Sequence, residues 1–132
     1  MKKRSLPNSK KKRSILYDKK MRAEERIQYG DMFFNEARYV EAAEFYRKAS
    51  FAEGMERLRV IAKEEGDSFL FELASKGSED GQDPRVWEEL GKRAFELKKY
   101  SHAIRAFRKA GNTALLEQAE LEFKGAVHSG KA

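Results

Sequence analysis

Residues 91–112, GKRAFELKKYSHAIRAFRKAGN, repeat the pattern of residues 30–51, GDMFFNEARYVEAAEFYRKASF, at one constant offset in the numbering. Glycine and alanine let two helices approach closely, and aromatic side chains fill the space beside them. A single helical hairpin cannot bury both of its faces, so the repetition predicts hairpins that stack and share a core. The corresponding positions are Gly30 and Gly91, Phe34 and Phe95, Tyr39 and Tyr100, Ala42 and Ala103, Tyr46 and Phe107, and the tripeptides Arg47-Lys48-Ala49 and Arg108-Lys109-Ala110.

Helical spacing of apolar residues continues along the rest of the chain from about residue 20. This spacing predicts an all-α fold of about seven helices in one domain over residues 15–128. The two repeat-like units span residues 23–49 and 84–110, with extra helices over 51–65 and 67–76 and a polar, glycine-containing loop over 77–83. Ser50 and Glu53 match a capping box, and Asp83 before Pro84 is a second helix start.

The composition excludes several classes of chemistry. The chain of 132 residues has no cysteine, so it can form neither disulfides nor thiolate metal sites and has no cysteine nucleophile. No stretch approaches the length of apolar sequence that crosses a bilayer, and the basic N-terminus lacks the apolar segment of a secretory signal. We therefore expect a cytoplasmic protein without membrane insertion.

Positive charge is concentrated at the N-terminus. Residues 1–20 contain nine Lys/Arg against Asp18 alone, whereas residues 21–132 contain 19 Lys/Arg and 21 Asp/Glu. Like-charge repulsion and the lack of apolar residues predict a disordered basic arm over residues 1–14. Its cations are expected either to solubilise the chain or to contact the phosphates of RNA or DNA. They are Lys2, Lys3, Arg4, Lys10, Lys11, Lys12 and Arg13.

No catalytic constellation is visible in the sequence. His102 and His128 have no ligand-spaced acidic residue beside them, and surface solvation explains both. Adjacent glutamates such as Glu64 and Glu65 point in different directions on a helix, and no strand precedes a glycine-rich phosphate loop. We therefore expect a protein that is not an enzyme and has no cofactor or metal.

At the repeated positions the sequence resembles the tetratricopeptide repeat family, a helix-turn-helix unit of about 34 residues. The first copy departs from the family pattern because Arg26 stands where tryptophan is usual. The offset from Gly30 to Gly91 is also too long for two adjacent units, and indicates either a degenerate middle repeat or an enlarged step resembling the helical tails of vesicle-coat and intraflagellar-transport proteins. The second copy matches the family signature at Trp87, Leu90, Gly91, Tyr100, Ala103, Phe107 and Ala110.

The resemblance implies a right-handed stack of antiparallel hairpins that acts as an adaptor for a partner protein. Such proteins hold a peptide or helix in a groove lined by the first helix of each repeat. The alternative interpretation of these positions is a solvated helix face with Phe34 and Phe95 in the core. Carried over by position, the groove residues are Gln28, Asp31, Phe34, Asn35, Glu88, Glu89, Lys92 and Phe95.

The two ends of such a stack differ in sequence. The last helix is rich in charged and amide residues, including Glu117 and Lys124, and is expected to cap one end. The other end, near Ile15 to Ile27, is less polar and makes a homodimer possible. Trp87, one turn before Leu90, is predicted to be a packing residue.

Overall fold

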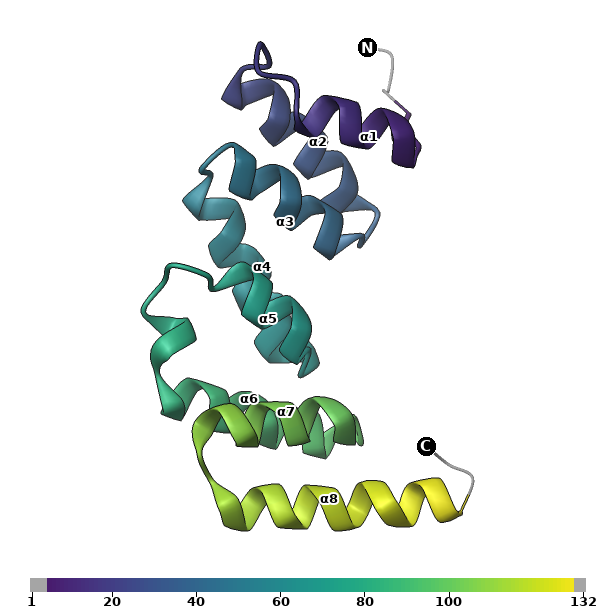
Figure 1. Ribbon diagram of the computed structural model, residues 1–132, viewed down its shortest axis with the longest axis vertical. Helices are drawn as coiled ribbons and strands as arrows, with labels where there is room; N and C mark the ends of the chain where they lie inside the picture. The colour runs from purple at the N-terminus through teal and green to yellow at the C-terminus, as the bar shows by residue number, and fades with distance from the viewer. Residues whose placement is uncertain (1–4, 130–132) are drawn as a thin grey trace. The chain divides into compact units, whose positions relative to one another are not determined.

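The computed structural model describes residues 5–129, and all the regular structure in this range is helical (Figure 1). This confirms the predicted all-α class, but eight α-helices are present in this range where about seven were expected. The elements are α1 (Ser9–Leu16), α2 (Ala23–Asn35), α3 (Tyr39–Lys48), α4 (Ala52–Glu65), α5 (Ser68–Ala74), the 3₁₀ helix η1 (Asp80–Gln82), α6 (Pro84–Glu96), α7 (Tyr100–Ala110) and α8 (Thr113–His128).

The chain divides into two compact units, Met1–Arg57 and Leu58–Ala132, whereas the sequence predicted one domain over 15–128. The division falls inside α4. The first unit contains the hairpin of α2 and α3, and the second contains the hairpin of α6 and α7 followed by α8. Two units arise because each hairpin buries its apolar residues against its own neighbouring helices.

The two hairpins close in the same way at their glycines. A Cβ added to Gly30 would lie 2.5 Å from Cε1 of Tyr46, and one added to Gly91 would lie 2.5 Å from Cε1 of Phe107. Each glycine therefore lets the second helix place an aromatic ring directly against the backbone of the first helix. The repeat in the sequence thus corresponds to a repeated packing geometry.

A second contact is repeated at the turn of each hairpin. The rings of Phe34 and Tyr39 meet edge to face with centroids 5.4 Å apart, and those of Phe95 and Tyr100 also lie 5.4 Å apart. Such pairs stabilise a fold beyond their burial by about 0.5–1.5 kcal/mol. The aromatic positions shared by the two sequences are therefore packing positions.

Helices α2, α3, α4, α6 and α7 end in the Schellman arrangement, with a residue in the left-handed region and two backbone bonds back to the last turn. Four of these ends form two equivalent pairs in the repeat, although the residue types differ. Ala37 corresponds to Lys98, and Ser50 corresponds to Gly111. The φ angles are 58° at Ala37, 52° at Ser50, 63° at Gly66, 61° at Lys98 and 73° at Gly111.

The predicted capping box at Ser50 is wrong. An N-cap residue has an extended backbone, whereas Ser50 is left-handed and its N–H donates to the carbonyl of Arg47 at 3.0 Å. Ser50 therefore ends α3, and α4 begins after Phe51. The start signal at Asp83 is confirmed, because its side chain accepts from the Arg85 N–H at 2.9 Å and Pro84 opens α6.

The basic N-terminal segment differs from the disordered arm expected over residues 1–14. Residues from Ser9 onward form α1, whose N-cap Asn8 accepts from the backbone N–H of Lys11 at 2.9 Å. Ile15 and Leu16 are buried, and α1 packs on α3. Burial of this apolar end and the cap offset the repulsion among the lysines. The expected arm residues Lys2, Lys3 and Arg4 lie outside the described residues.

The second unit has a core of small and aromatic residues. Ala94, Ala103, Phe107 and Ala119 form a buried cluster that joins α6, α7 and α8. The segment expected to be a loop over 77–83 contains η1, in which Gly81 accepts a hydrogen bond from the indole of Trp87 at 3.0 Å. No helix within residues 5–129 combines the length and apolar character needed to cross a membrane.

Candidate functional site

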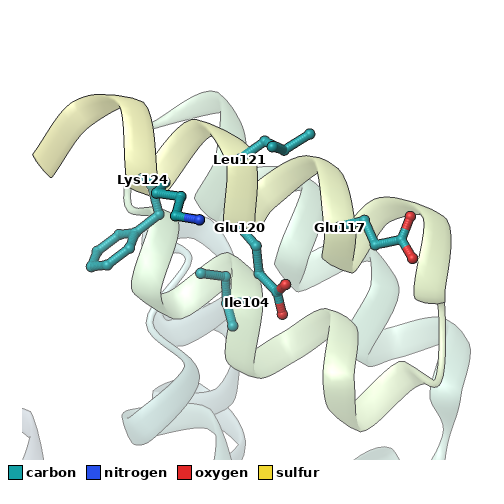
Figure 2. A pocket seen from close by; sticks show the side chains of 6 residues that line it. Ile104, Glu117, Glu120, Leu121 and Lys124 are labelled. Atoms are coloured by element: carbon teal, nitrogen blue, oxygen red, sulfur yellow. The ribbon is translucent and has the colours of Figure 1, made fainter. Parts of the chain in front are cut away.

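An open groove lies between α8 and α7 (Figure 2). It has a volume of about 470 Å³. Ile104 from α7 forms its floor, and acidic Glu117 and Glu120 lie on α8 with Lys124 one turn further on. The full lining is Ile104, Glu117, Glu120, Leu121, Phe123 and Lys124.

Large apolar side chains on α8 are exposed to solvent, and two of them, Leu121 and Phe123, line this groove. Leu121 is 71% exposed, Val127 is 50% exposed and Phe123 is 37% exposed. This differs from the polar cap that the sequence suggested for the last helix. Charged and apolar residues alternate along the sequence of α8, and its exposed residues include both kinds.

The corresponding part of α4 shows how such a face is covered within the chain. Helix α4 begins at Ala52 and α8 at Thr113, and these are equivalent positions of the repeat. In the second half of α4, Leu58 and Ala62 are fully buried. Helix α5 and η1 hold this half, since the Arg59 side chain donates to the carbonyl of Ala74 at 2.9 Å and Lys63 lies 3.3 Å from the Asp80 carboxylate.

Helix α8 lacks this cover in the described part of the chain. Ala119, which corresponds to Leu58, is buried, but Phe123, which corresponds to Ala62, is partly exposed. The charge also differs, because the position of Arg59 in α4 is taken by Glu120 in α8. A helix that covers α8 as α5 covers α4 would therefore meet acidic side chains.

The predicted groove residues of the first unit lie along α2. Gln28 and Asn35 are exposed, and Asp31 and Phe34 are half-buried. Asp31 accepts from the Tyr46 hydroxyl at 2.6 Å, and the Arg57 guanidinium lies 3.7 Å from Asp31 and 5.0 Å from the Phe34 ring centroid. Burial, with the hydrogen bond to Asp31, raises the pKa of Tyr46. Asp31 and Phe34 are thus both in contact with Arg57.

The predicted groove residues of the second unit lie along α6. Glu88 accepts from the Asn112 side chain at 2.6 Å and pairs with Lys92 at 3.5 Å, and the Asn112 hydrogen bond lowers the pKa of Glu88. Glu89 is exposed, and Phe95 is half-buried against the core. The two predicted sets belong to different units, so a common groove formed by both stays a prediction.

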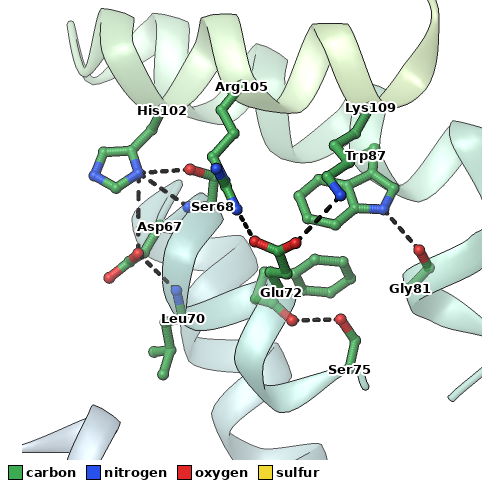
Figure 3. A network of polar contacts seen from close by, with 11 residues as sticks. Asp67, Ser68, Leu70, Glu72, Ser75, Gly81, Trp87, His102, Arg105 and Lys109 are labelled. Carbon is green, nitrogen blue, oxygen red and sulfur yellow. Dashed lines mark hydrogen bonds and ion pairs between the residues drawn. The ribbon is translucent and has the colours of Figure 1, made fainter. Parts of the chain in front are cut away.

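A polar network joins α5 to α7 (Figure 3). The Glu72 carboxylate lies between Arg105 and Lys109, 3.2 Å from the Lys109 ammonium. The backbone N–H and hydroxyl of Ser68 lie 3.0 and 2.8 Å from Nδ1 of His102. These bonds fix α5 against α7, so His102 is a packing residue rather than a freely solvated one. Within residues 5–129 no group of three or more His, Asp or Glu side chains is arranged to hold a metal ion.

The described cations of the N-terminal segment fall into two groups. Lys12 pairs with Glu44 at 3.4 Å on α3, whereas Lys10, Lys11 and Arg13 are exposed. Beside them lies Tyr17, which is 66% exposed and which the sequence does not single out as a site residue. Its ring lies 4.7 Å from the ammonium of Lys48. The two residues are far apart in the sequence, so no local pattern indicates the contact.

Comparisons with known proteins return no similarity: no family model matches the chain, and no curated protein or solved structure is significantly similar to it.

Proposed function

We propose that this chain is a non-catalytic helical-repeat adaptor, resembling tetratricopeptide repeat proteins, that binds an amphipathic helix of a partner protein in the groove between α7 and α8. The repeated contacts of Gly30 with Tyr46 and of Gly91 with Phe107 support a repeat architecture. A right-handed stack of such hairpins is the arrangement that the resemblance implies. The right-handed stacking of the two hairpins is therefore part of this proposal.

The observation that carries the proposal is the difference between α4 and α8. Two helices at equivalent positions in the repeat carry a similar apolar face, but within the described residues only α4 has a following helix packed upon it. Phe123 is the exposed counterpart of the buried Ala62, and fully covering a side chain of this size stabilises a complex by about 1.5–3 kcal/mol. A partner helix laid into the groove beside Ile104 would gain this burial.

Charge restricts the kind of helix that fits. Glu117 and Glu120 lie along one side of the groove, and the side chain of Glu120 is half-exposed and 3.9 Å from Arg108. We therefore expect a helix with an apolar stripe flanked by Lys or Arg. Rim charges of this kind select the partner and speed its encounter more than they add affinity.

The test places a photoreactive benzophenone amino acid at Leu121 and, as a matched control, at Val40, an exposed valine of the other unit. Cross-linked peptides from a cell extract are then identified by mass spectrometry. The proposal expects one segment captured from position 121 and not from position 40, with the stripe and flanking cations described above.

A direct binding measurement distinguishes specific docking from non-specific hydrophobic binding. A synthetic peptide of the captured segment should bind the unmodified chain about tenfold more tightly than the Glu117→Lys/Glu120→Lys variant, because charge reversal repels its cations. Cross-links only to a second copy of this chain would identify a homodimer surface and contradict the proposal. Equal affinity of both proteins for the peptide would contradict it as well.

A further inference from the structure

The net positive charge of the chain belongs to one of its two units. The unit Met1–Arg57 contains 15 Lys/Arg and nine Asp/Glu, whereas the unit Leu58–Ala132 contains 13 of each. Between residues 5 and 23 the only carboxylate is Asp18, which accepts from the backbone N–H of Lys20 at 2.9 Å. Such a surplus attracts polyanions to the first unit.

The packing of α1 decides which of its cations are available. Ile15 and Leu16 are buried, and Lys12 lies 3.4 Å from Glu44 and 3.9 Å from Glu41. These contacts turn one side of α1 toward α3. The other side, with Lys10 and Arg13, is exposed to solvent.

An exposed aromatic residue continues this free side. Lys10, Arg13 and Tyr17 are spaced by three and four positions, which places them in one row of roughly 10 Å along a helix. Tyr17 follows α1 as its C-cap residue and is 66% exposed. At the end of α3, Lys48 brings its ammonium to 4.7 Å from the centre of the Tyr17 ring. Three cations and an open aromatic face thus form one continuous surface.

We infer that Lys10, Arg13, Tyr17 and Lys48 form a binding site for single-stranded nucleic acid. The cations neutralise successive phosphates, and one unpaired base stacks on the exposed face of Tyr17. A duplex keeps its bases stacked on one another and cannot use this ring. A membrane is the weaker fit, because Ile15 and Leu16 are buried and leave α1 no exposed apolar face to insert.

This site is separate from the groove on α8 and does not depend on helix binding there. All four of its residues belong to the first unit, and the groove belongs wholly to the second. The sequence alone suggested sequence-independent phosphate contacts by the basic segment. The structure adds a stacking residue and a lysine from α3, which together favour single strands over duplexes.

The experiment measures binding of the full chain to a fluorescent oligouridylate of about twelve nucleotides by anisotropy, at several salt concentrations. Tyr17→Ala should weaken binding about tenfold, whereas Tyr17→Phe should retain it within about twofold, because stacking needs the ring and not the hydroxyl. Lys48→Gln should weaken binding several-fold and reduce the salt slope by roughly 0.7. Far-ultraviolet circular dichroism confirms that each variant remains helical.

Matched controls separate a site from a general charge effect. Lys76→Gln removes the same charge from an exposed lysine of the second unit and should leave the affinity unchanged. Equal weakening by Lys76→Gln and Lys48→Gln would overturn the site. Equal affinity for a duplex, together with no effect of Tyr17→Ala, would overturn the stacking role. Binding to phosphatidylserine vesicles but not to the oligonucleotide would assign the surface to lipid and overturn the inference.

Discussion

Trp87 and Arg26 show one structural task performed by two residue types at equivalent positions of the repeat. The Trp87 indole packs edge to face on Phe71, with centroids 4.8 Å apart, and donates to the carbonyl of Gly81 at 3.0 Å. Arg26 donates to the carbonyls of Met21 and Asp18 at 2.8 and 2.5 Å. Each side chain thus ties the first helix of its hairpin to the segment that precedes it. Arg26 makes this connection through hydrogen bonds alone, whereas Trp87 also buries its indole ring.

Replacing Trp87 with alanine should destabilise the second unit by about 3–5 kcal/mol, because the indole is 3% exposed and its removal leaves a cavity. Trp87→Phe retains a ring and should cost less. Urea unfolding followed by circular dichroism measures both, since Trp87 is the only tryptophan and its fluorescence is lost with it. A Trp87→Ala variant that unfolds at the wild-type urea concentration would contradict the packing role.

Tyr46 gives a prediction that depends on pH. Its hydroxyl donates to Asp31 and its pKa is raised, chiefly by burial, so the folded state holds the neutral form. Tyr46→Phe, which copies Phe107 of the other repeat, should cost about 1 kcal/mol at neutral pH. Because the pKa of Tyr46 is higher in the folded than in the unfolded state, its contribution to stability is complete at a pH below the unfolded-state pKa. The contribution is lost as the pH rises above that pKa.

The stability difference between the wild type and Tyr46→Phe should therefore be constant below pH of about 10 and shrink above it. Urea midpoints measured from neutral to alkaline pH test this course. A difference that grows with alkalinity would mean that the folded state favours the ionised tyrosine, contrary to its environment beside Asp31.

At the scale of the element, two helix ends have strained backbone angles, and a substitution by glycine can remove this strain. Ala37 and Lys98 have side chains at left-handed positions, where glycine is preferred. We expect Ala37→Gly to stabilise the first unit by about 1 kcal/mol, since it removes the steric cost of Cβ at this φ. Thermal unfolding gives the sign and size of the change.

A matched alanine provides the control. Ala114 is exposed in the first turn of α8, where the backbone is helical, so Ala114→Gly should destabilise by about 0.5–1 kcal/mol. Opposite signs for the same chemical change would locate the gain in the backbone angle. Destabilisation by both glycines would show that Ala37 is not strained.

The helix ends also show which parts of the fold can be predicted from the sequence and which cannot. Hairpin spacing and the start at Asp83 follow from local chemistry and are correct. Ser50 misleads because serine favours N-caps, whereas the Schellman bonds and the burial of Tyr46 place it at the end of α3. Helix α1 is not predictable in this way, because its stabilising contacts, such as Lys12 with Glu44, join residues far apart in the sequence.

The candidate sites are less predictable for the same reason. Tyr17 and Lys48 meet only after α1 packs on α3, and no spacing within either segment indicates the pair. Phe123, four positions after the buried Ala119, has the helical spacing of a core residue, and only the structure reveals that it is exposed. Periodicity identifies an apolar face but not whether another helix covers it.

At the scale of the whole molecule, the division into two units predicts separable stability. Phe45 is fully buried in the first unit and stacks on Phe33 and Tyr29, so Phe45→Ala should speed amide exchange in α2 and α3. It should leave exchange in α6 and α7 nearly unchanged. Trp87→Ala should have the reverse effect.

Hydrogen exchange followed by mass spectrometry resolves these regions in one experiment. Both substitutions remove an aromatic side chain from a core, so they are matched in kind. Faster exchange throughout the described residues for either variant would show a single cooperative unit and would contradict the division at Arg57 and Leu58.

The shared start of α4 and α8 has an evolutionary meaning. Ser50 and Gly111 end their helices in the same left-handed turn, and a new helix begins two residues later in each case. Consider a duplicated gene segment encoding residues 51–111 and inserted in frame after Gly111. At both of its ends the inserted segment would be preceded or followed by a left-handed turn of the kind found at Ser50 and Gly111. Lengthening the protein by whole repeats would therefore require no new type of turn at either junction.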